Sequence, residues 1–306
     1  MHSAALEHTR VFSPNLLNVL RAGFLRNPSI DGETAANNPA ADDPSLAFLP
    51  GQRAIGVVEV IGLSIYPGGT NAPDVNRHVF NSYQLDNDVT FNRGRHTLNF
   101  GARIERTRYN LDSQNSSSGE FRFRNIRDFL LNRPERFRAQ LPGSDTIRGQ
   151  RQTILGLYAE DTWRASNRLT FDLGLRYEWA SVPREVNGKI SNLDSLLDIE
   201  PRVGHPLYRN PSGRGIAPRA GFAWDLFGNA RTLLRGGYGI YADLLLSQFM
   251  IRASVRNPPF FRRGNTRNLR PGDFPKGGFP VLAQSGTPAL KAAIHDPAPR
   301  QPYLQQ

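Results

Sequence analysis

The chain has 306 residues, of which 39% are hydrophobic and 10% aromatic, with 28 glycines, 23 prolines and no cysteine. The missing cysteine excludes a disulfide framework and Cys-based metal sites or nucleophiles, and no apolar run reaches the ~18–20 residues of a transmembrane helix. The formal charge is +11, but the arginines are scattered without a basic helical stripe, so we expect no nucleic-acid partner.

The first part of the chain predicts three strands. Residues 9–26 are apolar but contain Pro14, and their apolar side chains occupy both odd and even positions. We predict a single strand there. Residues 81–92 and 95–110 alternate between apolar and polar side chains, which is typical of a strand whose two faces meet different surroundings. The Asn- and Gly-containing turn at 92–95 joins these two strands as a hairpin.

The second part predicts four further strands with the same alternation. In the clearest of them every second residue from Leu169 to Trp179 is apolar, while Asp172 and Arg176 lie on the other side. Tight turns at 165–168 and 227–231 join these strands in pairs. The four predicted strands are 151–165, 168–182, 216–227 and 231–243.

The connections alternate strictly between short and long. The long ones cover roughly 27–80, 111–150, 183–215 and 244–306, and all fall at one end of the sheet. Short turns at one end and long loops at the other are typical of outer-membrane barrels. The predicted fold class is therefore all-β: an antiparallel, up-and-down transmembrane β-barrel, with short helices expected at 125–132 and 290–295. A soluble β-sandwich explains the alternation equally well and stays open as the alternative.

In the barrel interpretation one face of each strand meets a watery lumen and the other meets lipid. The polar positions are then lumen-facing candidates: Gln84, Asp86, Asp88, Arg103, Glu105, Glu160, Asp172, Arg176, Glu178, Arg219, Asp225 and Arg235. Aromatic side chains near the strand ends are expected at the two lipid interfaces. They are Phe91, Tyr109, Trp163, Tyr177, Trp179 and Trp224.

Seven strands do not close a bacterial barrel, which uses an even number from eight upward. We therefore expect an incomplete barrel spanning 1–306, with a further strand before Thr9 and another after Gln306. The N-terminus has no basic segment followed by an apolar one, so it does not predict a signal peptide. The chain is expected to be an internal piece of a longer protein.

Two hairpins resemble those of TonB-dependent outer-membrane receptors. These are LYAEDTWRASNRLTFDLGLRYEW (157–179) and GIAPRAGFAWDLFGNARTLLRGGYGIYAD (215–243). Three more segments have counterparts in the same order in the Oar-like branch of that family. They are FSPNLLNVLRAGF (12–24), HVFNSYQLDNDVTFNRGRHTLNFGA (78–102) and DFLLNRP (128–134). DPAPRQPYLQQ (296–306) is similar to the loop end that precedes the next strand.

The resemblance implies a 22-stranded barrel in the bacterial outer membrane, filled by a plug and energised by TonB, that imports a scarce nutrient. The expected partners are outer-membrane lipid and lipopolysaccharide, the unknown nutrient, and the TonB system through a plug that this sequence does not show. The arginine group at 122–138 is expected to meet lipopolysaccharide or an acidic ligand. A structural or adhesive barrel without transport, and a soluble secreted carbohydrate-binding β-sandwich, are the alternative functions.

Other motifs predict no enzyme, cofactor or metal. GYGIYA (237–242) matches a dinucleotide-binding fingerprint, but strand alternation continues through its glycines where that motif requires a helix. The six histidines are dispersed, without a pair at metal-ligand spacing. Charged pairs such as Arg176 and Glu178 are ordinary on a lumen face and do not indicate acid–base catalysis.

Overall fold

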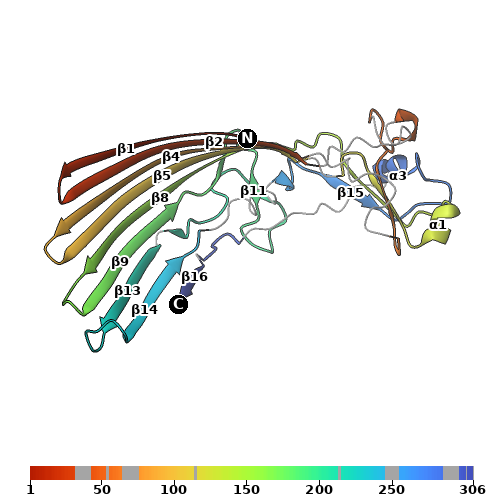
Figure 1. The fold of residues 1–306 in the computed structure, drawn as a ribbon. Coiled ribbons are helices and arrows are strands. Elements are labelled where there is room, and N and C mark those ends of the chain that lie inside the picture. Colours follow the sequence, from red (N-terminus) through yellow and green to blue (C-terminus); the bar gives the residue numbers. More distant parts are fainter. Residues whose placement is uncertain are drawn as a thin grey trace.

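The fold is dominated by one wide, curved antiparallel sheet (Figure 1). The computed structural model describes residues 1–31, 43–52, 55–63, 76–113, 116–212, 215–244, 255–284, 296–300 and 302–305. Each long strand of the sheet pairs with its neighbour along this order: β1 (His2–Ser13), β2 (Leu16–Asp31), β4 (Asn76–Arg93), β5 (His96–Ser113), β8 (Ile147–Trp163), β9 (Leu169–Ala180), β13 (Ile216–Asp225) and β14 (Leu233–Ala242).

Two short strands complete this sheet, which we call the wall. β16 (Tyr303–Gln305) pairs with β14, and β10 (Arg184–Glu185) pairs with β8 beyond the end of β9. In the described part of the chain the order runs from β1 to β16 without closing into a cylinder. The all-β, antiparallel and incompletely closed prediction is confirmed.

The N-terminal segment differs from its prediction. Residues 9–26 were expected to form one strand, but β1 and β2 form a hairpin whose turn contains Pro14. Proline lacks the N–H that a ladder needs, so it lies where the chain reverses. The apolar side chains of 9–26 occupy both odd and even positions because two strands of opposite direction meet within it. Within the described residues the wall therefore has eight long strands, and several run a few residues further than predicted.

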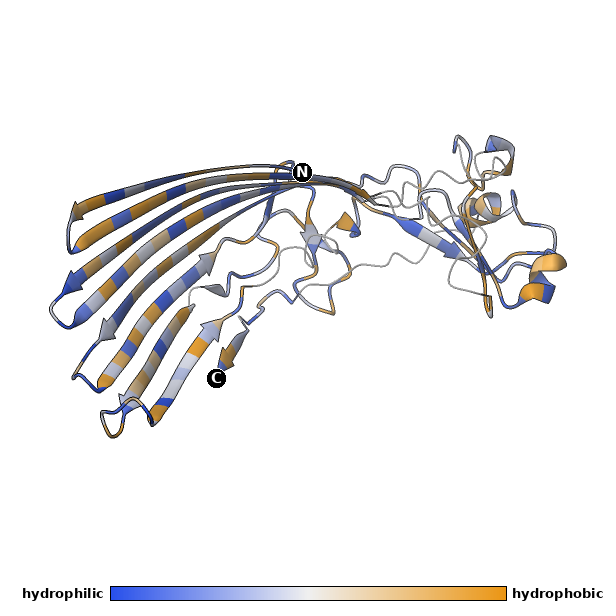
Figure 2. Cartoon of the chain, in the orientation of Figure 1, coloured by the Kyte–Doolittle hydropathy of each residue, from blue (hydrophilic) through white to orange (hydrophobic). Residues whose placement is uncertain are grey.

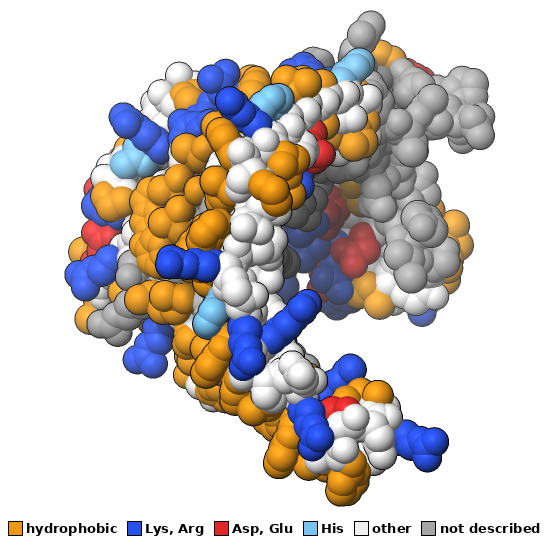
Figure 3. Space-filling model, turned by 60° about the vertical axis from the view of Figure 1, so that its left-hand side comes forward, with side chains coloured by type: hydrophobic (Ala, Val, Ile, Leu, Met, Phe, Trp, Pro, Cys, Tyr) orange, Lys and Arg blue, Asp and Glu red, His pale blue; other side chains and the backbone are white. Residues whose placement is uncertain are grey.

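The two faces of the wall differ in chemistry along its central strands, where the colours alternate in Figure 2. Hydrophobic side chains gather over the convex side, while charged side chains line the hollow (Figure 3). A β-sandwich would bury its apolar face, but Leu157 and Leu175 are each 52% exposed. The sandwich alternative is therefore wrong for this sheet.

The long connections build a second sheet at the end of the wall away from the short turns (Figure 1). We call it the loop sheet, and its strand order is β15 (Arg263–Thr266), β7 (Arg136–Gln140), β6 (Glu120–Phe123) and β3 (Val57–Val60). Its core contains Phe48, Phe121, Phe123, Phe137 and Leu282. Each of these residues comes from a connection between wall strands, so the loops share one core.

Short elements accompany the loop sheet. They are the 3-10 helix η2 (Pro44–Leu46), helices α1 (Ile126–Leu130) and α3 (Gly278–Gln284), and a small separate sheet of β11 (Ser191–Asn192) and β12 (Arg202–Val203). The helix predicted at 125–132 is present as α1, while the one predicted at 290–295 lies outside the described residues. The segment 244–306, expected as one long loop, contains β15, α3 and β16.

Candidate functional site

The register of the wall brings the predicted polar positions onto one face. Asp86 pairs with Arg103, Arg103 with Gly156, and Gly156 with Glu178, so one row crosses four strands. Directly paired residues of an antiparallel sheet share a face. By this criterion all twelve candidates lie together on what we call the polar face: Gln84, Asp86, Asp88, Arg103, Glu105, Glu160, Asp172, Arg176, Glu178, Arg219, Asp225 and Arg235.

One polar network on this face joins side chains of four strands, β1, β2, β4 and β8, and passes over β5. Arg21 Nε donates to Glu7 Oε2 at 2.7 Å, and Arg21 Nη1 donates to Asp88 Oδ2 at 2.5 Å. Tyr158 Oη donates to the other oxygen of Asp88 at 2.6 Å. The tyrosine ring fits because residue 101, on the intervening strand, is glycine: a Cβ there would meet Tyr158 Cε1 at 1.9 Å. A side chain at Gly101 would therefore displace the ring.

A second network neutralises charges in the middle of the wall. Glu105 accepts hydrogen bonds from Ser82 Oγ at 2.6 Å and from Gln84 Nε2 at 3.4 Å. Arg103 lies between two carboxylates, with Nη2 at 3.4 Å from Glu105 Oε2 and Nε at 3.5 Å from Asp86 Oδ1. Ser82 is buried, and the side chain of Glu105 is only 16% exposed. Hydrogen bonds to Glu105 offset the cost of its burial.

Ion pairs continue toward β13. Arg176 donates through Nε and Nη2 to Glu178 Oε1 at 2.8 and 2.6 Å. Arg219 Nη1 lies 3.9 Å from Glu160 Oε1. The polar face is thus a ladder of paired charges rather than a set of independent groups.

Asp225 also has a structural task at the short-turn end of this face. Its two carboxylate oxygens accept the backbone N–H groups of Gly228 and Ala230, both at 2.9 Å. Gly228 and Ala230 have φ values of 70° and 56°. The carboxylate therefore holds the left-handed turn that joins β13 to β14.

Glu7 and Arg21 are polar-face residues that sequence reasoning missed. Treating 9–26 as one strand left Glu7 outside the sheet and assigned no face to Arg21. The signal was available, because Glu7 and Thr9 alternate with Leu6 and His8 before the proline.

Five of the six predicted interface aromatics lie on the opposite, apolar face. Trp179 pairs with Leu155 and Tyr177 with Leu157, in the half of the wall nearer the long connections. Phe91, Trp163 and Trp224 lie near the short turns. The prediction for Tyr109 is wrong. It pairs with Phe80 and Gln150 on the polar face, its hydroxyl lies 2.5 Å from His78 Nδ1, and it packs against Leu111 and Val255.

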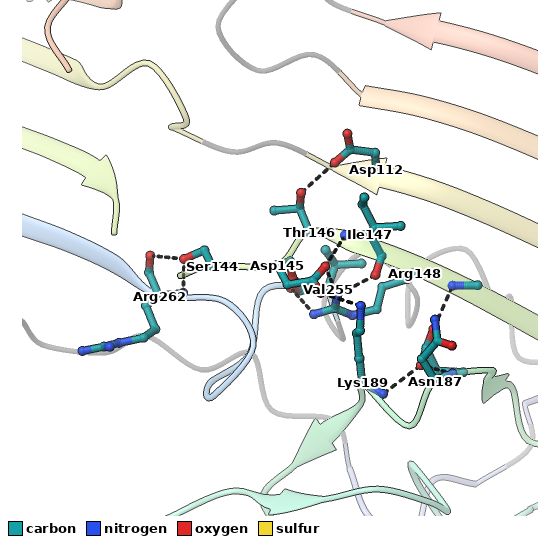
Figure 4. A network of polar contacts seen from close by, with 12 residues as sticks. Asp112, Ser144, Asp145, Thr146, Ile147, Arg148, Asn187, Lys189, Val255 and Arg262 are labelled. Atoms are coloured by element: carbon teal, nitrogen blue, oxygen red, sulfur yellow. Dashed lines mark hydrogen bonds and ion pairs between the residues drawn. The ribbon is translucent and has the colours of Figure 1, made fainter. Parts of the chain in front are cut away.

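A buried arginine joins the wall to the loops (Figure 4). The side chain of Arg148, at the start of β8, is fully buried. Its Nη1 donates to the carbonyl oxygens of Asp145 and Ile147, both at 2.8 Å, and Nη2 donates to that of Val255 at 3.4 Å. Arg148 therefore ties the segment before β15 to the wall.

Neighbouring carboxylates fix the connection after β10. Glu185 is buried and accepts the backbone N–H groups of Gly149, Asn187 and Lys189 at 2.9, 2.8 and 2.7 Å. Burial raises the pKa of Asp145, but the hydrogen bonds from Lys189 Nζ and the Ile147 N–H outweigh that effect, and its pKa lies below the ordinary value. The anionic form of Asp145 therefore holds Lys189 against β8.

A cleft of about 460 Å³ lies beside the loop sheet. Its walls combine apolar residues such as Leu49, Leu141 and Phe279 with uncharged polar residues that include Gln140 and Thr146. The carbonyl oxygen of the Gln140 side chain is buried without a hydrogen-bond partner. The cleft has the size and mixed lining of a small-molecule site.

Three of the six arginines in the group at 122–138 lie on strands of the loop sheet, and four of the six form ion pairs with glutamates. Arg136 Nη2 lies 2.8 Å from Glu120 Oε1, and Arg138 pairs with the same carboxylate. Arg122 Nε lies 3.6 Å from Glu59 Oε2. These ion pairs reduce the charge that the group presents to an anionic partner without removing it.

Neither a metal-binding cluster nor a membrane-crossing helix is present in the described residues. No group of three His, Asp or Glu side chains within those ranges could hold a metal ion. Among the same residues, no helix is both long and apolar enough to cross a membrane.

Comparisons with known proteins place the chain in a family. A family model described as an outer membrane beta barrel domain matches residues 1–306, whereas no curated protein matches the chain. Among solved structures, the outer membrane transporter YddB from Escherichia coli is similar at 12% identity and a TM-score of 0.48, over 83% of this chain and 27% of YddB. The copper transporter OprC is similar at 13% identity and a TM-score of 0.42, over 88% of this chain and 37% of OprC.

The chain thus spans well under half the length of either solved transporter. The family match, by contrast, covers every residue of the sequence. The chain belongs to the outer membrane beta barrel domain family, and the protein is a β-barrel protein of the bacterial outer membrane.

Proposed function

We propose that this chain forms part of the wall of a TonB-dependent, Oar-like receptor that binds a nutrient at its loops and imports it across the outer membrane. The observation that carries the proposal is the ladder of paired charges on one face of a sheet whose other face is apolar. A water-filled or plug-filled lumen is the environment that such a face requires, because exposed arginine at mid-membrane depth costs about 2–4 kcal/mol.

In this proposal the polar face contacts the plug through which TonB supplies energy. Carboxylates and guanidiniums that already satisfy one another, such as Arg176 and Glu178, present hydrogen-bonding surface without unpaired buried charge. A plug can therefore pack on them and still move. Lipid and lipopolysaccharide surround the apolar face.

The loop cleft is proposed as the place where ligand is first bound. Its polar lining residues, Gln52, Ser117, Gln140, Ser144 and Thr146, carry no charge, and its other walls are apolar. These features fit an uncharged ligand that carries hydroxyl or amide groups.

Single-cysteine labelling is expected to separate the two faces. The native chain has no cysteine, so each introduced thiol reports alone. A thiol at Asn99 on the polar face should react with a membrane-impermeant maleimide once the plug is released by urea. A thiol at Leu173 on the apolar face should react at least about tenfold more slowly, because lipid excludes the reagent. Equal rates at both sites would contradict the assignment of faces.

Uptake from a defined mixture of sugars, peptides and metal chelates tests transport. Cells that produce the protein are expected to deplete at least one solute faster than cells lacking its gene, and deletion of tonB should abolish the difference. Gln140→Leu should slow that depletion about five- to thirtyfold, because it replaces a polar lining side chain with an apolar one, a loss of ~1–2 kcal/mol. Gln284→Leu, at the exposed end of α3, should not change it. No depletion by any cells would contradict transport of these solute classes.

A second candidate function is that of a structural or adhesive barrel without transport. It is favoured by the connection between β11 and β12, where Leu196, Leu197 and Ile199 are all exposed and Ile199 is 99% exposed. Exposed aliphatic tips of this kind are typical of protein-binding surfaces. Under this alternative the gene deletion would leave depletion unchanged and would reduce attachment of cells to surfaces or to one another.

A further inference from the structure

A row of basic side chains crosses the apolar face near its loop end. Arg26 of β2 pairs with Asn81 of β4, Asn81 with Arg108 of β5, Arg108 with Arg151 of β8, and Arg151 with Arg184 of β10. These five residues, which we call the arginine row, are direct cross-strand neighbours. Like charges placed directly opposite one another destabilise a sheet unless an anion compensates them.

Among the described residues, no carboxylate forms an ion pair with an arginine of this row; Glu185, beside Arg184, acts on Arg151 only at longer range. Arg26 Nη1 donates to Asn81 Oδ1 at 3.1 Å, Arg151 Nη1 donates to Asn110 Oδ1 at 2.9 Å, and the Arg108 guanidinium lies 5.3 Å from the centre of the Tyr83 ring. All three partners are neutral. Among the described residues of this row and of the rows on either side, the apolar face carries no Asp or Glu.

The opposite face makes the contrast clear. There Arg21, Arg103 and Arg176 each contact at least one carboxylate. Arg106, which is two residues before Arg108 and on the same face, follows the pattern of the row: its Nη1 donates to Thr153 Oγ1, again a neutral group. These three arginines of the polar face therefore contact carboxylates, whereas Arg26, Arg106, Arg108 and Arg151 of the apolar face contact neutral groups.

The position of the row in the membrane follows from the strands below it. On β4 the apolar face runs from Tyr83 to Phe91, which is about 27 Å of strand at ~3.4 Å per residue. A tilt of about 35–45° brings this close to the height of a lipid-facing band. The arginine row begins at the next outward-facing residue, Asn81, on the side of the long loops. It therefore lies at the depth of the outer-leaflet headgroups.

We propose that the arginine row is a binding site for the phosphate groups of a phosphorylated glycolipid of the outer leaflet. Guanidinium groups bind phosphate oxygens in pairs through their planar donor fork. Arg108, Arg151 and Arg184 supply three forks side by side, and the acyl chains of the lipid lie along the apolar band beneath them. Lipid binding at this site does not require transport, so its test does not depend on the proposed function.

This site differs from the arginine group at 122–138, for which a lipopolysaccharide contact was expected. In that group Arg122, Arg136 and Arg138 already have glutamate partners. These three arginines also lie on the loop sheet, beyond the lipid-facing strands. The arginine row combines uncompensated charge with direct continuity to the lipid surface, and only this combination selects a lipid headgroup.

The test measures the lipid that stays bound to the protein purified from outer membranes in mild detergent. Mass spectrometry of the wild-type protein should find phosphorylated lipid A. The triple variant Arg108→Ser, Arg151→Ser, Arg184→Ser is expected to retain at least about tenfold less, because it loses three charge-assisted sites. The matched control Arg93→Ser, Arg164→Ser, Arg231→Ser removes the same charge near the short turns and should retain the wild-type amount.

Further arms identify the ligand and control for folding. The delipidated protein should bind phosphatidylethanolamine vesicles that contain lipid A but not vesicles that contain dephosphorylated lipid A, and excess inorganic phosphate should not displace the lipid. Equal lipid on the triple variant, or binding to both vesicles, would overturn the proposal, and complete displacement by phosphate would reduce the row to a simple anion site. If the triple variant lacks the heat-modifiable mobility of a folded barrel, Arg184→Ser on the short strand β10 replaces it, with a severalfold loss expected.

Discussion

Replacing Leu157 with arginine is expected to remove most of the folded protein from the outer membrane. Leu157 lies on the apolar face between Ala102 and Tyr177, in the middle of the band, and is 52% exposed. An arginine at this depth costs about 2–4 kcal/mol. That cost lowers the ratio of folded to unfolded protein roughly 30- to 700-fold.

The measurement is the heat-modifiable, urea-resistant fraction of the protein in isolated outer membranes. Asn99→Arg is the matched control, because residue 99 lies on the polar face directly opposite Glu160. The new guanidinium there meets water and a carboxylate, so we expect a change within about 0.5 kcal/mol. Equal losses in both variants would show that the two faces do not meet different solvents.

Replacing Phe121 with alanine is expected to unfold the loop sheet while the wall stays intact. Phe121 has no exposed surface and packs against Phe48, Phe137 and Phe274, with ring centroids 5.0, 4.6 and 5.3 Å away. Truncating a buried phenylalanine costs about 3–5 kcal/mol. A small sheet with one core has little stability to spare for such a loss.

Protease treatment of intact cells reports this loss. The variant should be cleaved within 114–146 and 255–284, while the wall strands stay protected and heat-modifiable. Leu130→Ala on α1 provides the control, because Leu130 is 74% exposed and its truncation removes little packing. Resistance of the Phe121 variant to protease would mean that the loops do not depend on this core.

Alternation was sufficient to predict the wall but not its first hairpin. From Leu169 to Trp179 the period of two is unbroken, so strand and faces follow directly. In 9–26 the chain reverses at Pro14, and apolar side chains occupy both odd and even positions. Treated as one continuous segment, this pattern does not reveal two strands. Tyr109 failed for another reason: its aromatic ring suggested an interface, although its odd number places it with Glu105 on the polar face.

The loop sheet was missed although its signal was present in short form. Phe121 and Phe123 alternate with Arg122 and Arg124, and Phe137 with Arg136. Four- and five-residue strands give too few repeats to separate from an irregular basic loop. Their pairing also joins segments that are distant in sequence, and no local pattern specifies such partners. The cleft and its unpartnered Gln140 follow from that long-range pairing and were equally hidden.

The origin of the loop sheet has a consequence for biogenesis. β3 comes from the connection between β2 and β4, β6 and β7 from that between β5 and β8, and β15 from that between β14 and β16. Wall strands can be added one hairpin at a time, but this sheet has to wait until hairpins far apart in the sequence have all crossed the membrane. An antibody specific for the folded loop sheet would therefore recognise only molecules whose insertion is finished, and would time that last step in living cells.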